Sequence, residues 1–408
     1  SNLDSLHAEA KNLGSFNPNM PLWGIPFAVK DNIDVNKIVT TAGCHEFSYI
    51  PKDDAFTVNL LKKSGALMIG KTNLDQFATG LVGVRSPYGA PLNAVDQLIV
   101  PGGSSSGSAV SVGHGIVSFS LGTDTAGSGR VPAALNNIVG LKPSLGSLSS
   151  SGVVPACRTI DTVSVFAMTV EDAYNVFTIL NEYDEKDSYS KSFKKFPLSL
   201  PQHPIKIGIP DKSSIRFFND NFQSESFDRN INKLKLNDFE ITPINFEPFY
   251  EIAQLLYEGS WVAERYTVIE DLLKKNSKAI HNVTRQIIKK AENFSAADTF
   301  EDYYKLSELK RKVKPILSSV DMLCVPSIPT FYSVNDLIND PFTPNSNLGT
   351  YTNFVNLLDM CGITVPTDPR IDGRPGSITF LAMSGEDNLV ASTAILFEKN
   401  CKRYLGGT

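Results

Sequence analysis

Apolar residues in the first part of the chain gather in short runs, and segments with helical spacing lie between these runs. The runs are typical of buried strands and fall at Ile25–Val29, Ala66–Ile69 and Ile116–Leu121. The intervening segments predict helices at 2–13, Ala55–Ser64, Ser106–Gly113 and Ser128–Asn136. Strands that alternate with helices predict an α/β fold, with helices on both faces of one sheet.

The second part of the chain has longer helical segments and fewer apolar runs. Strands are predicted at Ile205–Ile209, Met322–Pro326 and Ile363–Pro366. Helices are predicted at Phe222–Leu236, Phe249–Lys275, Ala279–Ala291 and Thr299–Leu317. The polar stretch Asp187–His203 predicts a surface excursion, and Pro341–Leu348 predicts a loop. No stretch resembles a flexible linker, so residues 1–408 are predicted to form one catalytic domain.

Composition narrows the class of partner. The chain has 408 residues, of which 42% are hydrophobic and 20% charged, and its net charge is −5. This is a soluble, globular balance, and the charge argues against nucleic acid or an anionic membrane as the main partner. A few lysines (Lys191, Lys194 and Lys195) stand close together, but they fit a solvated loop better than a nucleic-acid surface.

Cysteine and histidine spacing gives no sign of a metal site. The five cysteines are far apart and odd in number, and no CxxC pair occurs. The five histidines also lack the spacing of metal ligands. We therefore expect no metal, no cofactor and a reducing compartment, which points to a cytoplasmic protein.

Two clusters of glycine and serine carry the candidate chemistry. They are Gly102-Gly-Ser-Ser-Ser-Gly-Ser108 and Gly122-Thr-Asp-Thr-Ala-Gly-Ser-Gly-Arg130. A serine hydroxyl needs an adjacent base to act as a nucleophile, and no histidine stands in a suitable motif. Lys30 follows an apolar run, and burial would favour its neutral, basic form. This lysine could draw a proton from Ser128 through the hydroxyl of Ser104.

The second cluster also predicts an oxyanion hole. Successive backbone amides at Thr125, Ala126, Gly127 and Ser128 could stabilise the charge of a tetrahedral intermediate. A helix that starts at Ser128 would add partial positive charge there. Taken singly, a Gly/Ser run is typical of a loop and a lone lysine of a solvated charge. It is the joint occurrence of the motifs, in this order, that favours catalysis.

These motifs resemble those of the amidase signature family. The family's Gly-Gly-Ser-Ser-Gly-Gly-Ser is similar to Gly102–Ser108, and its Gly-Thr-Asp-Thr-Gly-Gly-Ser-Ile-Arg is similar to Gly122–Arg130. The resemblance covers nearly the whole chain and is most specific from Gly24 to Ser144. It implies a large twisted mixed sheet with helices on both faces.

The resemblance also implies roles for individual residues. Ser128 would be the nucleophile, Ser104 the bridging serine at a cis peptide, and Lys30 the base. Supporting positions at the turns around them are implied for Gly103, Ser105, Asp124 and Arg130. Ser105 would help by hydrogen bonding, and Asp124 with Arg130 is better explained as a structural ion pair than as part of the chemistry.

Within this family, the chain is most similar to the allophanate hydrolase group. Ala126 and Gly129 depart from the common family pattern but fit this group, as do Leu256–Arg265 and Gly349–Asn356. The resemblance implies that Tyr257 and Arg265 bind a small anionic substrate. Their spacing of eight predicts two turns of one helix face. Without the resemblance, a core aromatic and a surface ion pair with Glu264 or Glu258 would be the simpler interpretation.

The expected reaction is hydrolysis of allophanate with release of ammonia through an acyl-enzyme. The chain stops at Leu405–Thr408, about where the catalytic portion should end. We therefore expect the family's smaller C-terminal domain to be absent and N-carboxycarbamate to be the product. The resemblance also implies a homodimer and coupling, or fusion, to a biotin-dependent urea carboxylase.

Other functions remain open from the sequence. The chain could be a general aliphatic amidase, or the subunit of a glutamine-dependent amidotransferase that makes ammonia from glutamine. It could also be a catalytically silent scaffold of the same fold, although all three residues of the predicted triad are present.

Overall fold

The computed structural model describes residues 3–199, 204–237 and 239–402. The end of the predicted surface excursion, residue 2 of the first predicted helix and the chain end at 405–408 lie outside these ranges. Among the described residues, none of the helices is long and apolar enough to cross a membrane.

One mixed sheet of ten strands runs through the molecule, in the order β2-β1-β3-β5-β4-β9-β10-β8-β6-β7. The strands of its first half are β1 Pro26–Lys30, β2 Leu67–Thr72, β3 Phe119–Asp124, β4 Val139–Lys142 and β5 Thr162–Ala167. Those of its second half are β6 Lys206–Pro210, β7 Glu240–Ile244, β8 Met322–Pro326, β9 Met360–Pro366 and β10 Ser377–Met383. The predicted α/β fold with a mixed sheet is confirmed.

The strands are parallel at both edges of the sheet and antiparallel in its centre. β1 pairs in parallel with both β2 and β3, and β6 pairs in parallel with β7 and β8. The pairs β3–β5, β5–β4, β4–β9, β9–β10 and β10–β8 are antiparallel. Because β1 and β3 are parallel neighbours, their carboxyl ends meet at the same edge of the sheet.

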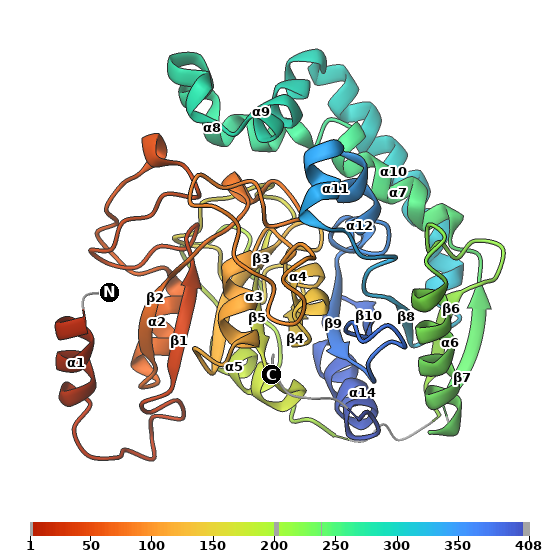
Figure 1. Cartoon of the computed structure of the whole chain (residues 1–408), viewed down its shortest axis with the longest axis horizontal. Helices are drawn as coiled ribbons and strands as arrows, with labels where there is room; N and C mark the ends of the chain where they lie inside the picture. The colour runs from red at the N-terminus through yellow and green to blue at the C-terminus, as the bar shows by residue number, and fades with distance from the viewer. Residues whose placement is uncertain (1–2, 200–203, 238, 403–408) are drawn as a thin grey trace.

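Helices cover both faces (Figure 1). In chain order they are α1 Leu3–Asn12, α2 Phe56–Lys63, α3 Ser106–Gly113, α4 Val131–Leu135, α5 Val170–Leu180, α6 Asn221–Leu236 and α7 Glu247–Glu258. The others are α8 Val262–Asn276, α9 Asn282–Lys289, α10 Ala296–Leu317, α11 Val334–Asn339, α12 Thr343–Leu348, α13 Asn353–Leu357 and α14 Asp387–Lys399.

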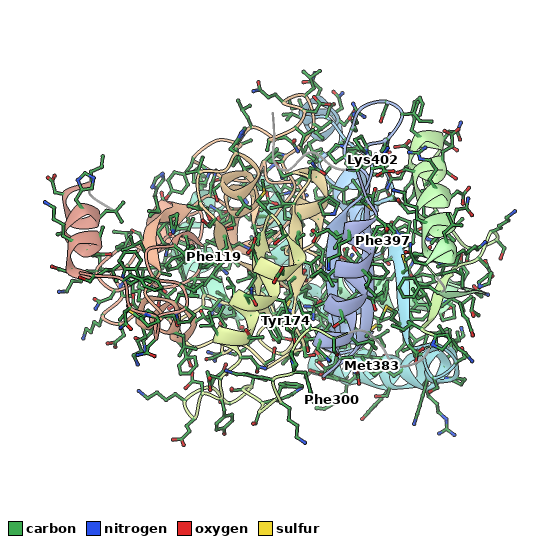
Figure 2. The ribbon with its side chains drawn as sticks, turned by 90° about the horizontal axis from the view of Figure 1, so that it is seen from below. Phe119, Tyr174, Phe300, Met383, Phe397 and Lys402 are labelled. Atoms are coloured by element: carbon green, nitrogen blue, oxygen red, sulfur yellow. The ribbon has the colours of Figure 1, made fainter. Side chains whose placement is uncertain are left out.

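Alternating side chains on β1 show how the two faces are filled. Phe27 and Val29 belong to the largest apolar core, whereas Ala28 between them belongs to a separate core. The first core holds residues of α2, α5 and α14, and Figure 2 shows Tyr174 of α5 and Phe397 of α14 on the helices over that face. The second core contains Ala109 and Val112 of α3. A period of two therefore sends successive side chains of this strand to opposite layers.

The prediction of one helix over Phe249–Lys275 is wrong. The chain forms α7 and α8, which are separated by Gly259, Ser260 and Trp261. The amide of Ser260 donates to Asp302 Oδ2 of α10 at 2.6 Å, and a side chain at Gly259 would meet the same carboxylate. The break is therefore set by packing against a helix that comes much later in the chain.

Two other predicted elements need correction. The prediction of a loop at Pro341–Leu348 is wrong, because Thr343–Leu348 forms α12 with Pro344 in its first turn, where proline is tolerated. The predicted helix Ser128–Asn136 shrinks to the five residues of α4, which begins only at Val131. Strands β4, β5, β7 and β10 have no counterpart among the predicted elements.

Candidate active site

Lys30 is the last residue of β1 and is fully buried. Its Nζ donates to Ser104 Oγ at 2.8 Å and to Thr123 Oγ1 at 2.7 Å. Thr123 lies near the carboxyl end of β3, next to β1 in the sheet. The predicted contact between Lys30 and Ser104 is therefore present. Lys30 and Thr123 both lie at the sheet edge where the parallel strands β1 and β3 end.

Burial lowers the pKa of Lys30 to about 7. The carboxylates of Asp75, Asp161 and Asp124 oppose this shift, and the positive charge of Arg265 adds to it. A pKa near neutrality means that a large share of Lys30 is uncharged at neutral pH and can accept a proton.

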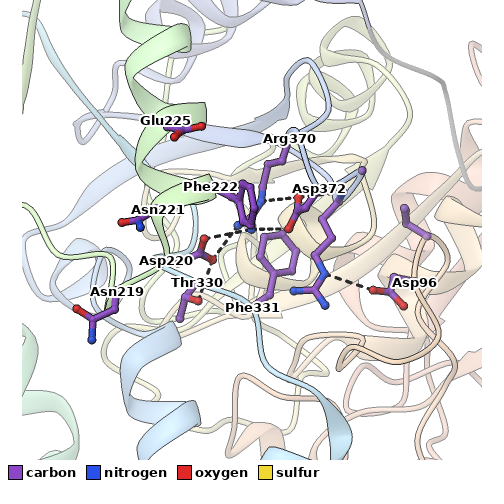
Figure 3. Close-up of a pocket in the computed structure, with 13 residues that line it drawn as sticks. Asp96, Asn219, Asp220, Asn221, Phe222, Glu225, Thr330, Phe331, Arg370 and Asp372 are labelled. Atoms are coloured by element: carbon purple, nitrogen blue, oxygen red, sulfur yellow. Dashed lines mark hydrogen bonds and ion pairs between the residues drawn. The ribbon is translucent and has the colours of Figure 1, made fainter.

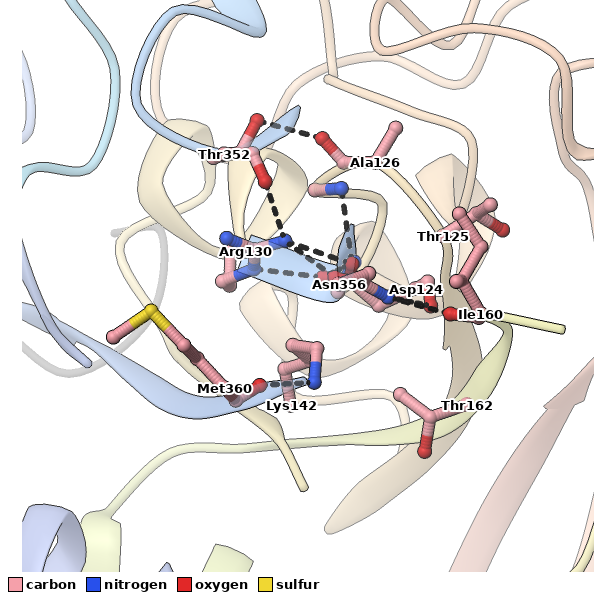
Figure 4. A network of polar contacts seen from close by, with 12 residues as sticks. Asp124, Thr125, Ala126, Arg130, Lys142, Ile160, Thr162, Thr352, Asn356 and Met360 are labelled. Atoms are coloured by element: carbon pink, nitrogen blue, oxygen red, sulfur yellow. Dashed lines mark hydrogen bonds and ion pairs between the residues drawn. The ribbon is translucent and has the colours of Figure 1, made fainter. Parts of the chain in front are cut away.

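A second buried lysine makes a useful contrast. Burial also lowers the pKa of Lys142, to about 8. Its Nζ donates to the carbonyls of Pro143 and Met360 at 2.8 and 2.6 Å, as Figure 4 shows for Met360. A carbonyl has no proton to give, so the contacts of Lys142 support structure, whereas those of Lys30 allow proton transfer.

Ser104 lies in the loop before α3 and is fully buried. The peptide bond between Gly103 and Ser104 is cis, as the family resemblance implied. A Cβ at position 103 would stand 2.0 Å from Asp75 Oδ2, so only glycine fits there. Asp75 also holds the loop directly, because its amide donates to the Ser104 carbonyl at 3.0 Å.

Ser105 supports the backbone of β3. Its Oγ donates to the Thr123 carbonyl at 3.1 Å and accepts from the Thr123 amide at 3.3 Å. The predicted hydrogen bonding of Ser105 is therefore present. It fixes the strand that carries Thr123 rather than a side chain of the predicted triad.

Ser128 lies between β3 and α4, is 2% exposed and precedes the helix by three residues. The expected helix N-terminus at Ser128 is therefore wrong, and the five residues of α4 give no basis for the proposed dipole effect. The described contacts contain no hydrogen bond between the hydroxyls of Ser128 and Ser104. The link from Ser104 to the nucleophile stays a prediction.

The turn that carries Ser128 wraps around the carboxylate of Asp124. Asp124 accepts hydrogen bonds from the amides of Gly127 and Gly129, each at 2.9 Å. The amide of Gly127 is therefore already occupied, which corrects its assignment to the oxyanion hole. The amides of Thr125, Ala126 and Ser128 have no backbone acceptor among the described contacts outside helices and strands, so they remain candidate donors.

Thr125, the fourth predicted member of the oxyanion hole, is anchored through its side chain. Its Oγ1 donates to Asp161 Oδ1 at 2.5 Å. Asp161 also accepts from the amides of Ala156 and Cys157, and burial raises the pKa of this carboxyl. This contact fastens the start of the turn to the segment before β5.

Asp124 and Arg130 form a two-pronged ion pair with both side chains fully buried (Figure 4). Arg130 Nε and Nη2 each donate to one carboxylate oxygen at 2.9 Å. Burial alone would raise the pKa of Asp124, but Arg130, together with Lys142 and the Gly129 amide, holds the pKa below its usual value. This geometry is that of a structural ion pair, as predicted.

Thr352, the residue before α13, closes the turn that carries Ser128. Its Oγ1 donates to the Ala126 carbonyl at 2.7 Å, and its own carbonyl accepts from Arg130 Nη2 at 3.2 Å (Figure 4). Gly127 has a φ of 126°, and a Cβ there would stand 2.4 Å from Thr352 Oγ1. Glycine is therefore required by both conformation and space.

Tyr257 and Arg265 lie on different helices, α7 and α8, which corrects their placement on one helix face. They nevertheless meet, because Arg265 Nη2 stands 3.4 Å from Tyr257 Oη. Arg265 is 2% exposed and forms no ion pair among the described residues, so the surface pairing with Glu264 or Glu258 is not found.

One edge of the buried Arg265 guanidinium has donors that the described residues do not use. Nη1 is held by Thr79 Oγ1 at 3.1 Å and by the Ala78 carbonyl at 3.3 Å. Nε is buried and has no partner, and Nη2 has only the long contact to Tyr257. Nε and Nη2 together form the fork that binds a carboxylate in two-pronged fashion.

A cavity of about 410 Å³ opens beside Tyr257. Three cationic side chains line it, Arg85, Arg216 and Lys290, against one carboxylate, that of Glu258. The excess of positive charge favours an anionic ligand. Among the described residues, no group of three His, Cys, Asp or Glu side chains is arranged to hold a metal ion.

Comparison with known proteins places these features in a family. A model of the amidase family matches residues 2–391. The chain belongs to the amidase family. This confirms the resemblance found in the sequence motifs.

Individual relatives carry related names. Urea amidolyase of Saccharomyces cerevisiae is 44% identical over 384 residues, which cover 93% of this chain and 21% of the relative. A solved structure of Kluyveromyces lactis allophanate hydrolase has 44% identity and a TM-score of 0.93, and it covers 97% of this chain and 65% of that one. A glutamyl-tRNA(Gln) amidotransferase subunit of Lawsonia intracellularis is 30% identical, with 98% and 88% covered. The chain thus spans about a fifth of the length of this urea amidolyase.

Sequence reasoning missed three residues that shape the amidase site. Thr123 belongs to the second glycine and serine cluster, Gly122–Arg130. Its place in that motif, one residue before Asp124, could have marked it as a site residue. Asp75 and Thr352 act through contacts with distant segments, so no local pattern marks them.

Proposed function

We propose that this chain hydrolyses allophanate and releases ammonia. The observation that carries the proposal is the buried contact of 2.8 Å between Lys30 Nζ and Ser104 Oγ. It provides a base of near-neutral pKa beside a hydroxyl relay. The similarity to urea amidolyase and to allophanate hydrolase supports the choice of substrate.

The first half of the reaction forms an acyl-enzyme. Uncharged Lys30 accepts the proton of Ser104, and Ser104 takes that of Ser128, whose Oγ attacks the terminal carbamoyl carbon. The amides of Thr125, Ala126 and Ser128 are the candidate donors that receive the oxyanion. As the C–N bond breaks, the lysine ammonium returns its proton through Ser104 to the departing nitrogen, which leaves as ammonia.

The second half repeats the relay with water. Lys30 takes a proton from water through Ser104, and the hydroxide adds to the ester carbonyl of the acyl-enzyme. The proton then returns to Ser128 Oγ as the ester bond breaks. The product is N-carboxycarbamate, which still carries the nitrogen between its two carboxylates.

Arg265 and Tyr257 hold the carboxylate of the substrate in this proposal. The free Nε–Nη2 edge of Arg265 matches the two oxygens of a planar carboxylate, and Tyr257 Oη stands beside it. Burial of this guanidinium strengthens the pairing because water does not screen it.

Ammonia release with a panel of substrates tests the proposal. Allophanate should be turned over, whereas biuret, which carries an uncharged amide in place of the carboxylate, and acetamide should be poor substrates. Ser128→Ala should lose the activity while keeping the fold. Equal turnover of all three substrates would point to a general aliphatic amidase.

The same purified chain can be used to test two alternative functions, an amidotransferase subunit and a silent scaffold. A glutamine-dependent amidotransferase subunit would release ammonia from glutamine in preference to allophanate. A silent scaffold would not react with a serine-directed fluorophosphonate, whereas the proposed nucleophile should be labelled at Ser128.

We also propose that the chain works with a biotin-dependent urea carboxylase, which would supply allophanate by carboxylating urea. The name urea amidolyase and the greater length of that relative support this coupling. A homodimer and a cytoplasmic location are proposed with it. Light scattering of the purified chain and cell fractionation would test these two points.

A further inference from the structure

Asn353, the first residue of α13, has a buried side chain with an unused acceptor. It is only 8% exposed, and its Oδ1 has no hydrogen-bond partner within the part of the chain that the structure describes. It lines the same cavity as Tyr257 and Arg85. A buried carboxamide oxygen without a partner is unfavourable in a folded protein, so such an atom calls for an explanation.

Neighbouring asparagines are satisfied by the protein itself. Asn345 Oδ1 accepts from the Leu81 amide at 2.8 Å, and Asn347 Nδ2 donates to Tyr332 Oη at 2.6 Å. Asn356 Nδ2 donates to the Asp124 and Ile160 carbonyls, and its Oδ1 accepts from Arg130. The open acceptor of Asn353 therefore does not reflect poor packing of the whole segment.

A larger hollow elsewhere in the molecule has, among its described residues, no buried polar side-chain atom that lacks a partner. It is lined by Asp220, Asp372, Phe331 and Arg370, and its volume is about 890 Å³ (Figure 3). The guanidinium of Arg370 donates to both carboxylates and to Gln223 Oε1. Both arginines that line it pair with carboxylates, and no buried polar side-chain atom among its described lining residues lacks a partner, so this hollow offers no comparable unmet group.

The position of Asn353 connects the cavity to the nucleophile turn. Thr352, the preceding residue, donates to the Ala126 carbonyl two residues before Ser128. Asn353 is also held at its backbone, because its amide donates to the Gly349 carbonyl at 3.0 Å. Its side chain lies against Gly349, where a Cβ would stand 2.4 Å from Nδ2.

We propose that Asn353 is a substrate-recognition residue whose Oδ1 accepts a hydrogen bond from the N–H between the two carbonyl carbons of allophanate. This rests on the proposed function. An acceptor aimed at that N–H selects an imide-like nitrogen over a methylene group. The site therefore recognises the centre of the substrate as well as its carboxylate.

Malonamate is the matched probe, because it has a CH₂ group in place of the bridging N–H and keeps both the carboxylate and the terminal amide. The wild-type chain should prefer allophanate to malonamate in kcat/KM. Asn353→Ala should reduce this preference by about tenfold, the order expected for one lost hydrogen bond in a water-poor site. The difference in chemical reactivity between the two substrates is the same for both proteins, so it cancels when the preference of the variant is compared with that of the wild type.

Further variants separate recognition from damage to the fold. Asn353→Leu keeps the volume but removes the acceptor, and Gly349→Ala keeps Asn353 but displaces its amide; both should reduce the preference as Asn353→Ala does. Gln254→Ala is the control, since Gln254 lines the same cavity with an exposed side chain and should leave the preference unchanged.

The outcomes distinguish this proposal from the proposed function. If wild-type chain does not turn over allophanate at all, the proposed function fails. If it does, and Asn353→Ala slows both substrates by the same factor, the recognition role is overturned. A crystal structure of Ser128→Ala with bound allophanate in which Asn353 Oδ1 contacts only water would also overturn it.

Discussion

Lys30 donates to Ser104 from a position that water does not reach, and the two residues lie 74 positions apart in the chain. The strand β1 delivers the amine and the loop before α3 delivers the hydroxyl. In the proposed mechanism, this single contact supplies the base that a serine nucleophile needs without a histidine. It also makes the lysine the most sensitive residue to test.

Removing the amine should abolish the proton relay. Lys30→Met keeps the length and burial of the side chain, and we expect kcat/KM to fall by about 10²–10⁴-fold, the range for loss of general base catalysis. The rate of fluorophosphonate labelling at Ser128 should fall with it. Lys142→Met is the matched control, because Lys142 is equally buried but bonds only carbonyls. Labelling of Lys30→Met at the wild-type rate would exclude the lysine as base.

The labelling rate should depend on pH in a defined direction. Lys30 must be uncharged to accept a proton, and burial lowers its pKa to about 7. The rate should therefore fall about tenfold per pH unit below 7 and level off above it. A profile measured with the fluorophosphonate avoids any titration of the substrate. The residual labelling of Lys30→Met should not show this fall in rate below pH 7. If the fall persists in that variant, a group other than Lys30 causes it.

Arg265→Met should remove the preference for an anionic substrate. Wild-type chain is expected to favour allophanate over uncharged biuret, and loss of a charge-assisted fork should reduce the ratio of the two kcat/KM values by about 10- to 100-fold. The effect should appear mainly in KM for allophanate, with turnover of biuret little changed. A parallel fall for both substrates would instead indicate that Arg265 holds the fold around Thr79.

The two small residues before the nucleophile should respond in opposite ways. Gly127→Ala forces a side chain into left-handed backbone and against Thr352, so we expect activity to fall at least about tenfold. Ala126→Gly restores the common family pattern and keeps the backbone N–H, so activity should stay within about threefold of wild type. Thermal unfolding of both variants shows whether the loss is local. A severe loss in Ala126→Gly would show that the methyl group of Ala126 shapes the pocket.

The sequence predicted β1, β2 and α3 well because the patterns that mark these elements are local. Apolar runs predicted β1 and β2, and the spacing of small residues predicted α3. Most ends of these predicted elements lie within one or two residues of the observed ends. Lys30, Ser104 and Ser128 stand in motifs dense enough to be recognised from one chain alone. The order and spacing of these motifs along the chain were enough to identify the three candidate residues, without knowledge of any contact between distant segments.

Other features depend on contacts that no local pattern shows. The break between α7 and α8 follows from Asp302 of α10, and it moves Arg265 to a different helix from Tyr257. The shortening of α4 follows from Asp124, which turns the amides of Gly127 and Gly129 toward itself. The unmet acceptor of Asn353 is visible only once its neighbours are known to be paired.

The hydrogen bond from Thr352 to Ala126 joins residues 226 positions apart. During synthesis, Lys30 and Ser128 therefore emerge from the ribosome long before Thr352, which closes the turn that carries Ser128. A nascent chain that has not yet exposed Thr352 should remain inactive. Proteolytic halves cut between the two positions should likewise regain activity only when mixed.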